Sequence, residues 1–369
     1  MFRNQDIQEL LAYQDEHPAL SVYFDNDFIE NTIEANKLKL RSMLDQLPSE
    51  AEQDIQAVQE YFDTVFDWTQ DRSCAVFSNQ AGDFFKAYIL SLEVPDQIRY
   101  SPQLLLKTLV SLHRTTSGYG IALVDQQSAR LLAFEMGELI AEKGYHGEDI
   151  QRIKHGGGSH TTGRWRGDEG EGEKVDTVRS RNLREAAEAA DDFFHKHDIR
   201  RIFLGGTEQN TAAFRAYLPK LWQSLITGVV SINTNANPQE VQRRVLEIGR
   251  EVDQRRKNKL VDTVITEAAK GRSGVVRTED VLGAVREGRV QTLLLDDSFK
   301  EPGFRCQGCE YLTVQELESC PFCGGAFETI DDTAEMAVKY VLLSGGNVEV
   351  VKDSPELQAH GGIAAHLRY

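Results

Sequence analysis

Four of the five cysteines form two Cys-x-x-Cys pairs near the end of the chain, Cys306 with Cys309 and Cys320 with Cys323. Each pair can present two thiolates to one ion, and four thiolates are the ligand set of a structural zinc site. The alternatives are a redox-active thiol pair or two disulfides, although disulfides are uncommon in cytosolic proteins. We predict one structural Zn²⁺, and four sulfur ligands leave no position for a catalytic water.

A second unusual segment is a glycine-rich stretch with positive charge on both sides. Its nine candidate RNA-binding residues are Lys154, His155, Gly156, Gly157, Gly158, Ser159, His160, Arg164 and Arg166. Successive glycines let the backbone approach a phosphate closely, and their amide groups can form an anion-binding nest. No Gly-Lys-Ser/Thr follows, which excludes a P-loop. Taken alone, the same pattern also fits a flexible loop without a ligand.

The chain as a whole is acidic, with 41 Lys and Arg against 58 Asp and Glu and a net charge of −17. This balance excludes binding to nucleic acid through general positive charge, so any RNA contact must be local. No apolar stretch is long enough to cross a membrane, and the first residues lack the apolar core of a signal peptide. We therefore expect a cytoplasmic protein. The fifth cysteine, Cys74, lies in an apolar run and is expected in the core.

The elements that position these residues begin with an N-terminal α+β domain, which we expect over residues 1–117. Apolar spacing predicts a strand at 20–24 and two helices between 31 and 68, with Ser49 capping the second helix. Apolar runs on both sides of a Ser-Asn-Gln-Ala-Gly-Asp turn predict a hairpin that ends near residue 90.

An α/β central domain is expected over residues 118–255, with the glycine-rich loop at 155–172. Its strands alternate with helices, which predicts a layered α/β structure. Gly205-Gly206-Thr207 is interpreted as a strand-to-helix turn. An α/β C-terminal domain follows over 256–369, with a zinc-ribbon-like insert at 303–328 that contains the four paired cysteines. The predicted fold class is therefore α/β multidomain.

Three features of the last third resemble the superfamily of archaeal and eukaryotic class I release factors and the rescue factor Pelota. They are the segment 278–295, the cysteine insert directly after it, and the ending 361–369. In addition, Lys154-His-Gly-Gly157 precedes a predicted long helix, where release factors carry a Gly-Gly-Gln loop. The N-terminal third is more similar to the bacterial branch of the superfamily, which includes a ribosome hibernation factor.

The resemblance implies a ribosome-binding translation factor that occupies the A site of idle or stalled ribosomes. Its implied partners are rRNA of the decoding centre and the peptidyl-transferase centre of the bacterial ribosome, and a translational GTPase such as EF-Tu. We expect a monomer with no membrane partner.

Two departures from the family pattern concern function. Release factors use a glutamine after the two glycines to position the water that cleaves peptidyl-tRNA, whereas Gly158 or Ser159 stands here, and we expect no catalytic residue. The Asn-Ile-Lys-Ser motif of stop-codon readers is also absent. We therefore predict a hibernation or rescue factor without cleavage. The alternatives are a peptidyl-tRNA hydrolase that uses Ser159 or His160, and a protein adaptor whose RNA contacts have been lost.

Overall fold

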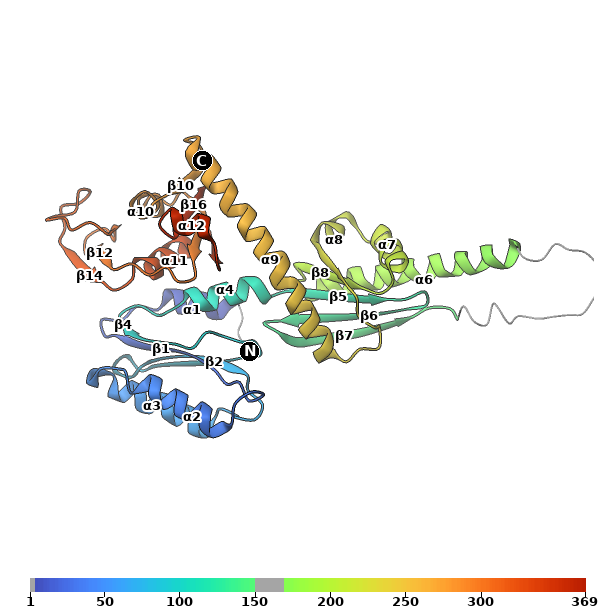
Figure 1. Cartoon of the computed structure of the whole chain (residues 1–369), viewed down its shortest axis with the longest axis horizontal. Helices are drawn as coiled ribbons and strands as arrows, with labels where there is room; N and C mark the ends of the chain where they lie inside the picture. Colours follow the sequence, from blue (N-terminus) through green and yellow to red (C-terminus); the bar gives the residue numbers. More distant parts are fainter. Residues whose placement is uncertain (1–3, 150–168) are drawn as a thin grey trace, which may run out of the picture. The chain divides into compact units, whose positions relative to one another are not determined.

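The computed structural model describes residues 4–149 and 169–369 and is a multidomain α/β protein with several sheets (Figure 1). Its contacts group the chain into two compact units. Unit 1 comprises Met1–Arg114 and Gln254–Tyr369, and unit 2 comprises Thr115–Asp253. Among the described residues, no helix combines the length and the apolar character needed to cross a membrane.

The N-terminal half of unit 1 is a four-stranded antiparallel sheet in the order β3-β2-β1-β4. Its strands are β1 (Ala19–Asp25), β2 (Ser73–Asn79), β3 (Phe84–Leu90) and β4 (Gln97–Ser101). Its helices are α1 (Asn4–Ala12), α2 (Ile33–Leu44), α3 (Glu52–Thr64) and α4 (Lys107–Thr116). Alternate residues of β1, Leu20, Val22 and Phe24, pack with α2 and α3 in one core, which also contains the buried Cys74. The predicted strand, hairpin and core cysteine are confirmed.

The C-terminal half of unit 1 contains a sheet in the order β10-β16-β11-β15, in which β11 and β15 are parallel. Its strands are β10 (Gly274–Val276), β11 (Val290–Asp296), β15 (Asn347–Val351) and β16 (Ile363–Leu367). Its helices are α10 (Thr278–Arg286), α11 (Thr333–Leu343) and α12 (Pro355–Ala359). The cysteine insert forms a separate sheet in the order β13-β12-β14, from β12 (Gly303–Cys306), β13 (Leu312–Thr313) and β14 (Phe327–Ile330).

The two halves of unit 1 are joined by polar contacts that are largely buried. The carboxylate of Glu335, on α11, accepts hydrogen bonds from the Leu106 and Lys107 N–H groups at 3.0 and 3.1 Å, at the start of α4. Arg99 on β4 pairs with the buried Asp332 at 3.0 Å. Burial, reinforced by the charge of Asp332, raises the pKa of Glu335 to about 6. An acceptor at a helix N-terminus satisfies amide groups that have no partner inside the helix.

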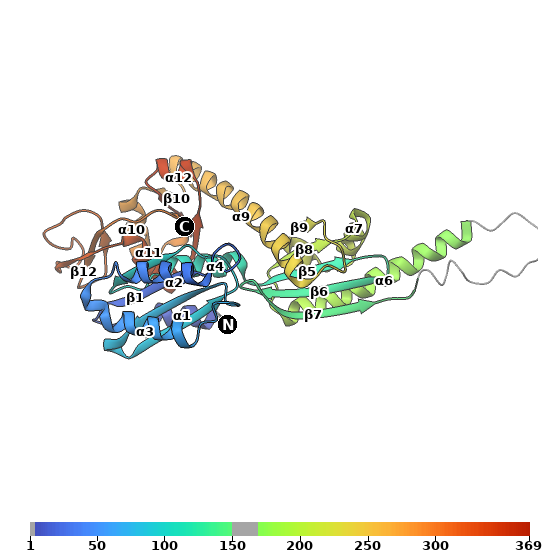
Figure 2. The same ribbon diagram turned by 60° about the horizontal axis from the view of Figure 1, so that its bottom comes forward.

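Unit 2 is a five-stranded sheet with helices on both faces (Figure 2). The order is β7-β6-β5-β8-β9, with β5, β8 and β9 parallel. The strands are β5 (Tyr119–Val124), β6 (Ser128–Glu135), β7 (Glu138–His146), β8 (Arg201–Gly205) and β9 (Ile226–Val230). One face is covered by α6 (Glu169–Lys196), α7 (Glu208–Tyr217) and α8 (Lys220–Leu225), and the other by the first half of α9 (Pro238–Ala269).

Local details differ from the sequence predictions. Ser49 does not cap α3: it begins a 3-10 turn, its hydroxyl contacts Glu50, and α3 starts after Ala51 without a side-chain cap. The helical region after Gly205-Gly206-Thr207 is divided into α7 and α8, because Pro219 cannot continue a helix. Strands β4 and β7 were not predicted.

Candidate functional site

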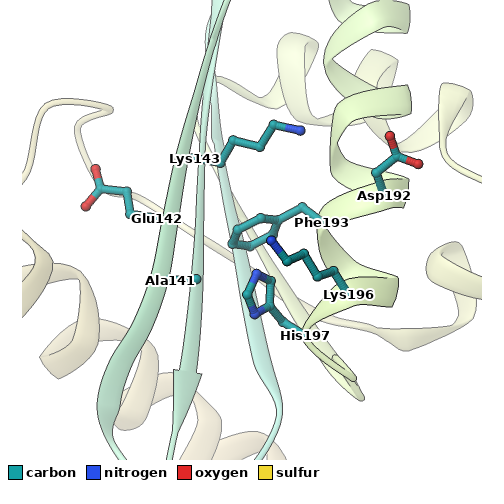
Figure 3. A pocket seen from close by; sticks show the side chains of 7 residues that line it. All are labelled: Ala141, Glu142, Lys143, Asp192, Phe193, Lys196 and His197. Atoms are coloured by element: carbon teal, nitrogen blue, oxygen red, sulfur yellow. The ribbon is translucent and has the colours of Figure 1, made fainter.

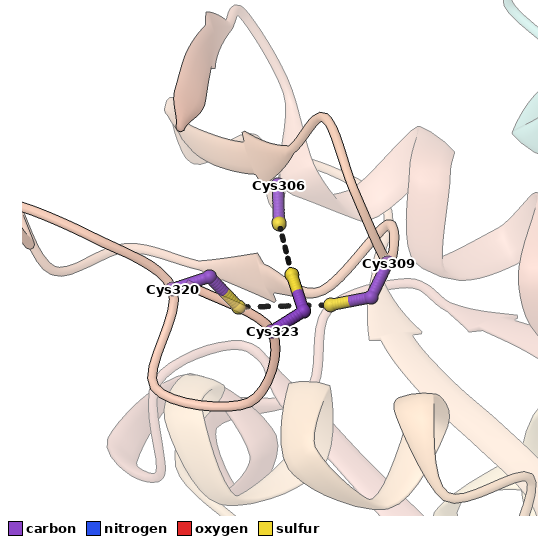
Figure 4. A group of neighbouring side chains, drawn as sticks. All are labelled: Cys306, Cys309, Cys320 and Cys323. Atoms are coloured by element: carbon purple, nitrogen blue, oxygen red, sulfur yellow. Dashed lines mark hydrogen bonds between the residues drawn. The ribbon is translucent and has the colours of Figure 1, made fainter. Parts of the chain in front are cut away.

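The four cysteines of the insert converge on one point (Figure 4). All four Sγ atoms lie within 4.8 Å of one another. Two of the separations are 3.4 Å between Cys306 and Cys323 and 3.6 Å between Cys309 and Cys320. Metal–sulfur bonds of about 2.3 Å in a tetrahedron give sulfur–sulfur edges of about 3.8 Å, whereas a disulfide needs about 2.05 Å. Each of these two separations joins one Cys-x-x-Cys pair to the other, so both pairs face the same point.

Both pairs use the same backbone turn. In the first, the Glu310 N–H donates to the carbonyl of Cys306 and the Cys306 N–H donates to that of Tyr311, each at 2.9 Å. In the second, the equivalent bonds join Gly324 to Cys320 and Cys320 to Gly325, also at 2.9 Å. The residue after each pair has positive φ, 59° at Glu310 and 74° at Gly324. Two equivalent turns that face each other hold four thiols ready for one ion.

Two glycines give the sulfurs the space that they need. A Cβ on Gly308 would lie 3.0 Å from the Cys323 sulfur. A Cβ on Gly325 would lie 3.2 Å from the sulfur of Cys306 and 3.3 Å from that of Cys323. Side chains at these positions would therefore press on the cluster from both turns.

The backbone also prepares the charge of the cluster. Burial opposes ionisation of Cys306, but N–H groups of Cys309 and Gly308 outweigh it and lower its pKa to about 6. The Gly325 N–H favours the thiolate of Cys323, yet the neighbouring thiols of Cys306 and Cys309 raise its pKa to about 12. The cluster without an ion thus keeps both thiolate and thiol, and a metal would displace the remaining protons.

The insert is attached to the C-terminal core through α10. The Glu279 carboxylate accepts hydrogen bonds from the hydroxyl of Thr313 at 2.7 Å and the N–H of Val314 at 2.6 Å. At the other end of the helix, the Arg286 guanidinium lies 3.4 Å from the ring centroid of Phe322, which is inside the second cysteine pair. A metal at the cysteines would therefore order a module that is fixed to both ends of α10.

The predicted RNA-binding loop, Lys154 to His160 with Arg164 and Arg166, lies outside the described residues. The structure describes the segments on both sides of the loop, and the Asn182 side chain connects these two segments. This buried α6 residue accepts from the Glu148 N–H at 3.0 Å and donates to the Glu148 carbonyl at 3.0 Å. A Cβ on Gly147 would lie 2.4 Å from Asn182, so the close approach requires glycine. Arg181 pairs with the Glu148 carboxylate as well.

Gly205-Gly206-Thr207 forms the predicted strand-to-helix turn. Gly206 has φ 132°, and a Cβ there would lie 2.2 Å from the carbonyl oxygen of Val124. The Thr207 side chain accepts from the Asn210 N–H and caps α7. The glycines are thus explained by backbone packing.

Further charged residues hold the chain where it passes from one unit to the other. In unit 1 the buried Glu349 pairs with Arg114 at 2.7 Å and with Arg256 at 2.8 Å. In unit 2, Arg201 donates to the Thr115 carbonyl at 2.8 Å and lies 3.7 Å from Asp253. In each unit, one side chain therefore binds both of the chain segments that lead to the other unit. This side chain is Glu349 in unit 1 and Arg201 in unit 2. Sequence reasoning missed Glu349, Arg201 and Asn182, because no local motif marks a long-range partner.

Residues 105–250, about two fifths of the chain, match the family described as Bacterial archaeo-eukaryotic release factor family 10. This segment is therefore similar to bacterial proteins of the archaeo-eukaryotic release factor type. It contains α4, nearly all of unit 2, the glycine-rich loop and Asn182. The predicted resemblance is confirmed. No curated protein matches the chain.

Solved structures with low similarity to this chain include a translation termination factor and Pelota-type proteins. Archaeal translation termination factor aRF1 has 16% identity and a TM-score of 0.25, with 99% of this chain and 96% of that chain covered. Archaeoglobus fulgidus Pelota has 15% identity and a TM-score of 0.32, with 80% and 79% covered. S. cerevisiae Dom34, a translation termination-like factor, has 12% identity and a TM-score of 0.40, with 82% and 81% covered.

Proposed function

We propose that this protein is a ribosome-associated translation factor that occupies the A site of idle or stalled ribosomes, as a hibernation or rescue factor. The observation that carries the proposal is the family match over residues 105–250, which includes the glycine-rich loop. The hydrogen bonds between Asn182 and Glu148 also support the proposal. They fix the backbone before the glycine-rich loop, and a loop that enters a narrow RNA site must start from a fixed position.

The loop would supply the contact with rRNA. Lys154, Arg164 and Arg166 place positive charge beside three glycines in a chain of net charge −17. Such local charge suits insertion into RNA, where phosphate contacts position the protein. By the sequence resemblance, the N-terminal part would face the decoding centre, and a translational GTPase such as EF-Tu would be the second partner.

Zinc would be the ion at the cysteine cluster. Four thiols at tetrahedral separations, with no carboxylate or histidine among them, fit Zn²⁺ and leave no open position for a reaction. Cys306, Cys309, Cys320 and Cys323 would hold it, and its role would be to fold the insert.

Sedimentation with vacant bacterial 70S ribosomes tests the proposed function. Replacing Lys154, Arg164 and Arg166 by Ala should weaken binding and flatten its dependence on salt, since each phosphate contact releases counterions. The matched control replaces three exposed cations of unit 1, Lys270, Arg272 and Arg277, by Ala. Equal affinity and equal salt slope in the two triple variants would remove the proposed role of the loop. No binding by the unmodified chain would favour the adaptor alternative.

A further inference from the structure

A pocket of about 360 Å³ lies in unit 2 between the edge strand β7 and the C-terminal end of α6 (Figure 3). Phe193 and Ala141 line its apolar part, and the Phe193 ring centroid lies 4.7 Å from that of the His197 ring. Lys143 from β7 and Lys196 from α6 extend beside these rings. The pocket therefore combines the partly exposed His197 ring, which lies against the buried Phe193, with two ammonium groups.

The two lysines differ from most cations around them. Arg130 pairs with Glu142 at 2.6 Å, Arg200 with Asp198 at 2.8 Å, and Arg181 with Glu148. Within the described parts of the chain, neither Lys143 nor Lys196 makes an ion pair or a hydrogen bond. Two ammonium groups without a protein partner, on either side of one pocket, are available to an anion.

The acidic residues of the pocket do not neutralise these lysines. Glu142 is engaged by Arg130 and points away from Lys143, on the opposite face of the strand. The Asp192 carboxylate is directed away from the Phe193 ring. Burial, together with the charge of Lys196, lowers the pKa of His197, so its neutral ring adds a stacking surface and no charge.

We propose that this pocket binds one nucleotide unit of RNA, with the base against the His197 ring, which packs on the buried Phe193, and the phosphate between Lys143 and Lys196. The proposal rests on the proposed function and deepens it, since it adds an rRNA contact outside the glycine-rich loop. Stacking on aromatic rings tolerates every base, and lysine binds phosphate as a point charge. An acidic peptide strand added to the edge of β7 is the competing occupant, and the partly exposed His197 ring favours a base over a peptide.

The test uses the full chain and a fluorescent eight-nucleotide oligoadenylate, without ribosomes. The two double variants described next also carry Ala in place of Lys154, Arg164 and Arg166, so that binding by the glycine-rich loop does not mask binding by the pocket. Lys143→Ala with Lys196→Ala should weaken binding at least tenfold and reduce the slope of log affinity against log salt by about 0.7, because the contact with one phosphate is lost. The control, Lys220→Ala with Lys270→Ala, removes the same charge elsewhere and should leave both quantities unchanged. His197→Ala should weaken binding without changing the salt slope.

Equal affinity and slope in the two double variants would overturn the pocket proposal. The proposal would also be overturned if Lys143→Ala with Lys196→Ala left oligonucleotide binding unchanged but abolished sedimentation with ribosomes. That result would assign the pocket to a protein partner. Because the oligonucleotide assay needs no ribosome, the two proposals fail separately. Oligonucleotide binding that depends on Lys143 and Lys196, without ribosome sedimentation by the unmodified chain, would support the pocket and refute the proposed function.

Discussion

At the scale of single residues, the cysteine cluster shows that the residues of a short motif can determine the local backbone geometry. The two Cys-x-x-Cys turns have equivalent backbone hydrogen bonds, and the glycines at 308 and 325 leave room for the sulfurs. This part of the site was predictable because each turn is local and the identity of its residues dictates its shape. What the spacing did not show is the attachment of the insert to α10 through Glu279 and Arg286.

Zinc content provides the first prediction. We expect the reduced chain to hold about one equivalent of Zn²⁺, and Cys309→Ser to hold less than about half an equivalent, because one of four ligands is lost. The insert of that variant should exchange its amide hydrogens faster, since metal binding contributes to its folding. Elemental analysis and hydrogen exchange measure the two effects. Cys74→Ala is the control, because Cys74 lies in the N-terminal core and should leave the zinc content unchanged. Equal zinc in both variants would contradict the four-thiolate site.

Glu335 provides a prediction about pH. Its pKa is raised from 4.5 to about 6 by burial, so the folded state binds a proton more tightly than the unfolded state. Stability from this group is therefore greatest at low pH and is lost as pH rises from about 4.5 to about 6, by about 2 kcal/mol. Glu335→Gln keeps an oxygen acceptor for the start of α4 but cannot ionise, so this loss should disappear.

The measurement is the opening free energy of the α4 amides from hydrogen exchange, corrected for intrinsic rates at each pH. The variant Glu316→Gln removes an exposed carboxylate of the insert and serves as the control. We expect the pH dependence to persist in the control and to flatten in Glu335→Gln. The same pH dependence in both variants would refute the assignment to Glu335.

At the scale of elements, predictions succeeded where apolar periodicity marks a buried face and failed where it does not. Strands β1 and β2 are almost wholly buried, and their apolar runs predicted them. Strand β7 lies at a sheet edge and is mostly exposed, so its residues carry no apolar alternation. Pairing with β6 selects the strand conformation there, and this tertiary effect leaves no local signal.

Asn182 gives the prediction for this scale. Asn182→Ala removes the bonds that join α6 to both backbone groups of Glu148, and a buried amide left without its partner costs about 1–3 kcal/mol. We expect faster exchange of the Glu148 N–H and weaker ribosome binding, with the rest of unit 2 protected as before. Asn258→Ala, on the exposed side of α9, is the matched control. Asn182→Asp keeps the acceptor for the Glu148 N–H and should restore part of its protection. Normal Glu148 protection in Asn182→Ala would contradict the role of Asn182 at the loop root.

At the scale of the whole molecule, the association of the first and last segments of the chain in unit 1 could not be predicted from the sequence. Its first and last segments are separated by the whole of unit 2, and contacts such as Arg99 with Asp332 join residues more than two hundred positions apart. The same applies to Glu349 and Arg201, each of which secures two distant points of the chain. Only a folded chain brings such partners together, so composition and periodicity cannot reveal them.

The final prediction concerns the whole molecule on the ribosome: binding without cleavage of peptidyl-tRNA. By the resemblance, cleavage needs a glutamine after two glycines to orient water, and Gly158 has no side chain to do so. Displacing a catalytic group by about 1 Å can already cost about a hundredfold, so Ser159 or His160 should not replace it. Saturating protein added to ribosomes with labelled peptidyl-tRNA in the P site should release no more peptide than buffer, against a release-factor control. Release comparable to that control, abolished by Ser159→Ala or His160→Ala, would make the hydrolase the correct function.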